Sequence, residues 1–246
     1  MKTLNFKVLP QKSHLALFIF ALLLTSFVCN SQSRNYSIVY SDNIKGGSTM
    51  LGNTLMHIID NGTVNLAKMN DNSADGNSIY GNNHQNMQYV DIDGNTGNGN
   101  VTRNSSSADL FLPAGTNTIK LARLYWGGFI VNTEFDLTAE ENKKIKIRKG
   151  TTDVYLNVTA LGLDKNLVNG IYSQYQAYAD ITAFVKQNGA GTYEVGNAPL
   201  SVGNFSISGA NGGWCIVVVY ENNDLNYNSI RLYKPVARFA YCHGSG

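Results

Sequence analysis

The chain has 246 residues, of which 43% are apolar and only 15% charged, and its formal net charge is +2. That charged fraction lies below the roughly 25% usual in soluble domains, so uncharged polar residues must supply most of the surface. Residues 1–33 contain three lysines and no acidic residue, so the rest of the chain has 16 basic and 17 acidic residues and a net charge of −1. A nearly neutral surface argues against nucleic acid and anionic membranes as partners.

Residues 1–33 predict a helical secretory signal peptide. Their lysines precede an uncharged apolar run, Leu15–Val28, and small polar residues follow near Ser31 and Ser33, where a peptidase would cleave. The run is shorter than the about 20 apolar residues that a membrane-spanning helix needs. We therefore expect a secreted or cell-surface protein with no membrane insertion after cleavage. A lipid anchor on Cys29 is the alternative.

The next hundred residues predict short strands separated by turns. The expected strands are Tyr36–Tyr40, Thr49–Ile59, Met87–Ile92, Ala108–Leu112 and Thr118–Val131, with turns at Ser41–Asn43, Gly46–Gly47 and Asn61–Gly62. The polar segment Asn70–Asn86 has too few apolar groups to order itself and is expected to be a long surface loop. Gly127 and Gly128 predict a bulge or a close backbone approach within their strand.

The clearest hairpin pattern is Lys143–Thr159. Ile145 and Ile147 alternate with basic residues, and after a turn Val154, Leu156 and Val158 alternate with polar ones, which is typical of strands with one wet face.

A different spacing follows at residues 181–185. Ile181, Phe184 and Val185 recur at helical spacing, with Asp180 placed as N-cap and Gly189 as terminator, so one or two helical turns are expected.

Two more strands complete the pattern. Thr192–Val195 resumes β structure, and Trp214–Tyr220 is apolar at every position, which indicates a central strand buried on both faces. Many short strands with one short helix predict an all-β protein, a jelly-roll-like β-sandwich. We expect one domain over residues 34–230 and an atypical basic tail at 231–246, which suggests a truncated or frame-shifted gene end.

The cysteines bear on the compartment. Cys215 is interpreted as a buried free thiol, with a Cys215–Cys242 disulfide as the alternative in an oxidising environment.

Several segments together resemble the N-terminal region of large secreted adhesin-like surface proteins of Bacteroidota. They are ADLFLPAGTNTIKLARLYWGG (Ala108–Gly128), YADITAFV (Tyr178–Val185), GGWCIVVVYE (Gly212–Glu221) and the polar run Ala74–Asn95. Such proteins often carry repeated β-domains and a gliding-motility or type IX secretion sorting domain. The resemblance implies a non-catalytic extracellular module that contacts a glycan or protein surface.

Acidic residues suggest a calcium site. Asp91, Asp93 and Gly94 look like the start of a calcium loop, although the spacing beyond them departs from an EF-hand. The candidate oxygen ligands are Asp75, Asp91, Asp93 and Asp109. The alternative is a strand whose Asp91 and Asp93 simply point outward before a turn; beyond calcium, no cofactor is expected.

Tyrosines are the candidate ligand-binding residues, because their rings can stack on sugars while their hydroxyl groups remain hydrated. The candidates are Tyr80, Tyr172, Tyr175 and Tyr178. Tyr172 and Tyr178 would share one face if their segment is extended. Trp126 and Trp214 lie among apolar neighbours and are assigned to the core.

Catalytic patterns are absent from the sequence. His57, His84 and His243 form no HExxH or other metal-ligand spacing, and no G-x-S-x-G elbow occurs. We therefore expect no enzyme activity. The alternative function is a carbohydrate-binding or glycan-processing domain of a secreted enzyme.

Overall fold

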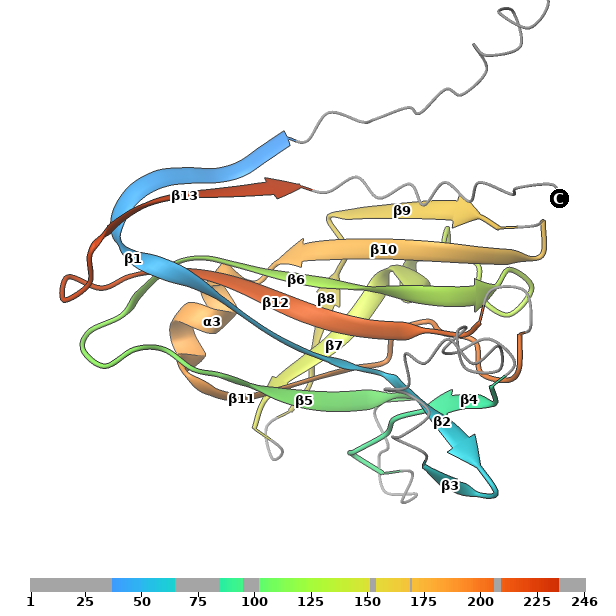
Figure 1. The fold of residues 1–246 in the computed structure, drawn as a ribbon. Coiled ribbons are helices and arrows are strands. Elements are labelled where there is room, and N and C mark those ends of the chain that lie inside the picture. Colours follow the sequence, from blue (N-terminus) through green and yellow to red (C-terminus); the bar gives the residue numbers. More distant parts are fainter. Residues whose placement is uncertain are drawn as a thin grey trace, which may run out of the picture. The chain divides into compact units, whose positions relative to one another are not determined.

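The computed structural model describes residues 37–64, 85–94, 102–150, 154–168, 170–205 and 209–234. They fold as an all-β sandwich with one α-helix, as the sequence predicts, and all belong to a unit spanning Tyr36–Phe239 (Figure 1). The predicted signal peptide, the polar segment up to residue 84 and the tail beyond Lys234 lie outside the described residues.

The larger sheet has six antiparallel strands. Its order is β13 (Tyr227–Lys234), β1 (Ser37–Thr54), β12 (Gly212–Glu221), β6 (Thr118–Val131), β10 (Tyr172–Asp180) and β9 (Gly162–Leu167). The prediction of a central strand at 214–220 is confirmed, because β12 lies between β1 and β6. Strand β13 pairs with β1 as far as Lys234, past the boundary expected at residue 230.

Strand β1 is one long strand and not two. Gly46–Thr54 pairs with β12, whereas Ser37–Lys45 pairs with β13, so the predicted turns at Ser41–Asn43 and Gly46–Gly47 are both wrong. Glycine is required at this junction, since a Cβ on Gly46 would lie 2.1 Å from the carbonyl oxygen of Tyr220.

The paired ends of β1 and β13 cover part of the sheet. Ile44 packs with Leu121 and Val219, and half-buried Tyr40, Ile230 and Leu232 pack against them in a small second core. Leu121 and Val219 point away from the main core, and we call this side of the six-stranded sheet the outer face.

The second sheet has four strands and closes the main core. Its order is β5 (Ser105–Leu110), β11 (Gly191–Gly196), β7 (Lys144–Lys149) and β8 (Leu156–Thr159), so the hairpin predicted at 143–159 is confirmed. Side chains of both sheets, among them Trp126 and Ile147, form one buried cluster. The indole Nε1 of Trp214 donates to Ser106 Oγ at 2.8 Å and ties the two layers together.

A small third sheet extends from β1. It contains β2 (Met56–Asp60), β3 (Thr63–Val64) and β4 (Met87–Tyr89). The predicted turn at Asn61–Gly62 is confirmed, and both residues have positive φ, 49° and 78°, as a two-residue hairpin turn requires.

Two short helices complete the described structure. They are the 3₁₀ helix η1 (Glu140–Lys143) and α3 (Thr182–Asn188), and neither is long and apolar enough to cross a membrane. The predicted helix is confirmed, with Gly189 at its end at φ 62°. The N-cap is Ile181, while Asp180 accepts a hydrogen bond from the Thr182 amide at 2.9 Å.

Gly127 and Gly128 mark a close backbone approach and not a bulge. The pairing of β6 with β10 runs through both residues without a register shift. A Cβ on Gly127 would lie 2.2 Å from the carbonyl oxygen of Tyr175. These glycines therefore let neighbouring strands pack at the middle of the sheet.

Candidate functional site

The predicted tyrosines divide between the two faces of β10. Tyr172 and Tyr178 lie on the outer face together with Gln174 and Gln176, because the strand is extended and its side chains alternate. Tyr175 points the other way, is 5% exposed and belongs to the main core. A side chain enclosed in the core cannot contact a ligand at the surface, so the prediction of Tyr175 as a ligand contact is wrong. The same burial raises the pKa of Tyr175 well above the usual value. Tyr80 lies outside the described residues.

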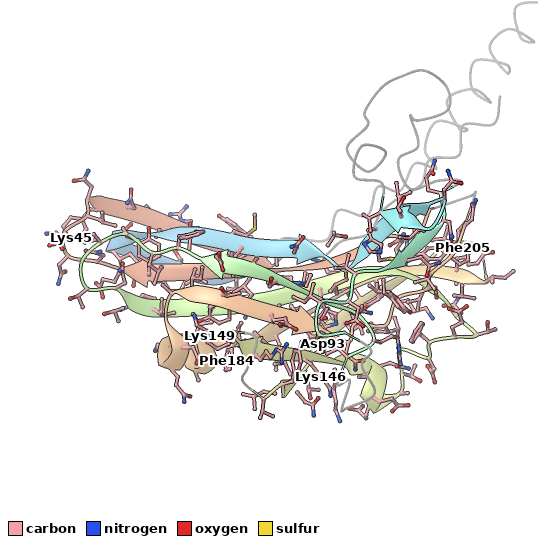
Figure 2. All side chains as sticks on the ribbon, turned by 90° about the horizontal axis from the view of Figure 1, so that it is seen from below. Lys45, Asp93, Lys146, Lys149, Phe184 and Phe205 are labelled. Carbon is pink, nitrogen blue, oxygen red and sulfur yellow. The ribbon has the colours of Figure 1, made fainter. Side chains whose placement is uncertain are left out.

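Tyr172 is held in an aromatic group at one end of the outer face. Its ring centroid lies 5.3 Å from that of Phe129 and 5.6 Å from that of Phe205. Phe129 is fully buried beneath these rings, and Phe205 comes from the segment before β12 (Figure 2). The half-buried Tyr172 ring is thus fixed in place by packing.

Tyr178 belongs to a second group, which we call the Arg123 cluster: Arg123, Tyr125 and Tyr178. Tyr178 pairs with Tyr125 across β10 and β6, with ring centroids 6.2 Å apart. The guanidinium carbon of Arg123 lies 5.2 Å from the Tyr178 ring centroid, in cation–π geometry. Burial raises the pKa of Tyr125, and the neighbouring Arg123 opposes that rise. The cluster joins a cation to two phenol rings on a rigid sheet.

The acidic residues Asp91 and Asp93 follow β4, and both contact Ser105, the first residue of β5. Ser105 Oγ donates to Asp91 Oδ1 at 3.0 Å and contacts Asp93 Oδ1 at 3.3 Å, and Thr102 Oγ1 donates to Asp93 Oδ2 at 2.8 Å. Burial, followed by the hydrogen bond to Asp93, raises the pKa of Asp91. Burial alone would raise the pKa of Asp93 too, but hydrogen bonds, first that from Asp91, lower it. Asp91 is therefore the one of the two that protonates first.

The predicted calcium ligands do not come together. Asp109 lies at the far end of β5, where its carboxylate accepts a hydrogen bond from Thr192 Oγ1 at 2.6 Å, so its assignment to a shared site is wrong. Asp75 lies outside the described residues. Within the described segments, no three His, Cys, Asp or Glu side chains are grouped as metal ligands.

A buried ion pair that sequence reasoning missed lies beside the acidic pair. Arg148 Nη2 donates to both Glu194 oxygens, at 2.9 and 2.8 Å, and the Tyr155 hydroxyl donates to the same carboxylate. The Glu194 side chain has no exposure, and that of Arg148 is 12% exposed. Alternation in the sequence places Glu194 on the opposite face of its strand from Tyr193 and Val195, but its partners Arg148 and Tyr155 come from distant parts of the chain.

Lys146 lies near the acidic pair and the ion pair, on the outside of the four-stranded sheet. It pairs with Gly196, and Gly196 pairs with Ser105, so a residue without a side chain separates the lysine from the acidic pair. Asp93 and Lys146 lie on the same side in Figure 2.

An apolar groove of about 450 Å³ opens between β8, the end of β10 and α3. Ile147 and Ile181 form its buried floor, while Leu156 and Leu161 at its rim are 51% and 65% exposed. Leu156 pairs with buried Ile147 and shares its face, as the alternation predicts, but it stays exposed at the edge of the sheet. Val154 precedes β8 and is 85% exposed, so the alternation predicted for this residue is wrong. Strand β8 lies at the edge of its sheet, where the second layer does not cover it.

Cys215 lies on the outer face, directly opposite Tyr125 in the pairing of β12 with β6. It is a free, half-buried thiol, less buried than expected, and burial raises its pKa. Cys242 lies outside the described residues.

Comparisons with known proteins found no match to this chain among family models, curated proteins or solved structures.

Proposed function

We propose that this chain is a non-catalytic extracellular module of a secreted or cell-surface adhesin-like protein. It acts by surface contact, and its contact surface is the outer face of the six-stranded sheet. The observation that carries the proposal is the row Tyr172, Gln174, Gln176 and Tyr178, which lines one side of β10. The family resemblance of the sequence supports the same class of function.

The row combines two properties of a contact surface. Phenol rings offer apolar area with a polar tip, and glutamine amides both donate and accept hydrogen bonds. All four side chains are half-buried, so neighbours restrict them while part of each stays open to solvent. Side chains held in this way lose little conformational entropy on binding.

Carbohydrate binding is the second candidate, and a specific observation favours it. Asp164 and Asn166 of β9 pair with Gln176 and Gln174, so amide and carboxylate groups extend the row across two strands. Rings beside amide and carboxylate groups suit a sugar, whose apolar ring face stacks while its hydroxyls form hydrogen bonds.

A binding comparison tests both candidates. The purified chain is applied to a glycan array and to immobilised extracellular matrix proteins, and the measurements are repeated with Tyr178→Ala and Gln176→Ala. The control is Tyr227→Ala, because Tyr227 is 73% exposed and lies on β13, outside the row.

Loss of binding in the two row variants, but not in the control, is the expected result. Binding to glycans selects the second candidate, and binding to protein alone selects the first. Binding that survives both row substitutions refutes the outer face as the contact surface.

A further inference from the structure

Among the described residues, no carboxylate forms an ion pair with Arg123. Asp180 is directly opposite in the pairing of β10 with β6, but it accepts a hydrogen bond from the Thr182 amide. Ion pairs among the described residues join Lys120 to Glu221, Lys143 to Glu140 and Arg148 to Glu194, and none includes Arg123.

Donor groups without acceptors converge in the Arg123 cluster. Nε and Nη1 of Arg123 and the hydroxyl of Tyr125 are buried, and no hydrogen bond of good geometry reaches any of the three in the described structure. Arg123 and the Tyr125 hydroxyl are close enough for the arginine to lower the pKa of the tyrosine, but neither group meets a carboxylate there. Tyr125 as a whole is only 8% exposed. Buried polar groups are normally hydrogen-bonded, and leaving them unpaired costs free energy.

The other half-buried arginine, Arg148, has both a tyrosine ring and a carboxylate as neighbours. Arg148 lies between a tyrosine ring, 4.3 Å from its guanidinium carbon, and the carboxylate of Glu194. Arg123 has the tyrosine ring, but the described segments place no carboxylate in an ion pair with it. The geometry is therefore that of a guanidinium beside two phenol rings, whose buried donors meet no carboxylate of the described residues.

We propose that the Arg123 cluster is a subsite for the acidic group of a saccharide, either the carboxylate of a uronic acid or a sulfate ester. The anion accepts hydrogen bonds from Arg123 and from the Tyr125 hydroxyl, and the attached sugar ring lies against Tyr178. This inference rests on the proposed function, because it names the ligand class of the same outer face.

A saccharide fits this face better than an acidic peptide. The neighbouring residues Gln174, Gln176 and Asn166 present amides, which suit sugar hydroxyls.

Titration calorimetry of the intact chain tests the inference with four probes. They are polygalacturonate for the carboxylate, chondroitin sulfate for the sulfate, dextran as the neutral polysaccharide and polyglutamate as the acidic peptide. Arg123→Gln removes the charge, Arg123→Lys keeps it without the planar fork, and Arg231→Gln is the control because Arg231 is exposed on β13.

We expect one or both acidic polysaccharides to bind more tightly than dextran and polyglutamate. Arg123→Gln should weaken that binding roughly tenfold to a hundredfold, as is typical for a lost charge-assisted hydrogen bond. Arg123→Lys should recover part of it, and Arg231→Gln should leave it unchanged.

Melting temperature provides a second readout. Arg123→Gln should be at least as stable as the natural chain without ligand, because the charge that it removes has no carboxylate partner, and the acidic polysaccharide should raise the melting temperature of the natural chain only. A large loss of stability in Arg123→Gln without ligand identifies a structural arginine and overturns the proposal.

Two other results would overturn the inference. The first leaves the proposed function intact, and the second refutes that as well. Equal binding of dextran, or tighter binding of polyglutamate, refutes the acidic saccharide but keeps the outer face as a contact surface. If none of the four probes binds and the row variants still attach to matrix proteins, both proposals fail.

Discussion

The ion pair of Arg148 and Glu194 gives the sharpest test of how β7 and β11 are held together on the outside of the four-stranded sheet. Glu194→Gln keeps the size of the side chain and removes its charge, so no cavity forms. The guanidinium then lies beneath Tyr155 with no anion, although the Arg148 side chain is only 12% exposed. Breaking a buried pair from one side costs about 3–5 kcal/mol.

That cost translates into a large shift in melting temperature. For a domain of about 200 residues, 1 kcal/mol corresponds to roughly 2–4 °C, so Glu194→Gln should lower the melting temperature by roughly 6–20 °C. Tryptophan fluorescence follows the unfolding, because Trp126 and Trp214 are 2% and 5% exposed and become solvated when the core opens.

Two further variants separate the cause from a general loss of packing. The double variant Arg148→Met, Glu194→Met replaces the pair with apolar groups and should recover most of the loss, since no unpaired charge is left. Glu140→Gln removes the exposed partner of Lys143 and should leave the melting temperature unchanged. A shift in Glu194→Gln below about 2 °C, or a double variant as unstable as the single one, would refute this reasoning.

Three other expectations concern the backbone and the titrating groups. Gly127→Ala should strongly destabilise the larger sheet, since its Cβ would lie 2.2 Å from the carbonyl oxygen of Tyr175; urea denaturation measures the loss, and an unchanged midpoint contradicts it. At pH 7 Asp91→Asn should raise the melting temperature and Asp93→Asn should lower it, because the folded state raises the first pKa and lowers the second. The Asp93 contribution should disappear as the pH falls below about 4, where the unfolded carboxyl takes up its proton; a pH-independent difference would contradict the assignment. Burial raises the pKa of Tyr193 to about 12, so its contribution should be complete below about pH 10 and be lost toward pH 12. Ultraviolet absorbance of the natural chain and Tyr193→Phe shows whether this tyrosine ionises late.

Local sequence patterns predicted the strands whose two faces differ. Strand β6 has the predicted bounds, and the hairpin of β7 and β8 and the Asn61–Gly62 turn are confirmed. Each is determined by residues close in the chain, through alternation or through residues that accept positive φ. The helix at 182–188 follows from the same local logic.

Sequence patterns failed where a distant partner decides the conformation. The glycine pair of β1 reads as a turn, yet pairing with β12 and β13 extends the strand through it. Leu156 alternates like a core residue but lies at the edge of its sheet, where no second layer covers it. Likewise, the spacing of Tyr172 and Tyr178 predicted their shared face, but not that Tyr175 is buried in the main core.

The sequence by itself determined the fold class, most strand positions and the tyrosine segment, because these depend on periodicity within a few residues. Only the tertiary structure decided which polar groups meet. Arg123 and Tyr178 are 55 residues apart in the chain, and Arg148 and Glu194 are 46 apart. Their contacts depend on which strands lie side by side, since sheet order is set by long-range pairing that no local pattern encodes.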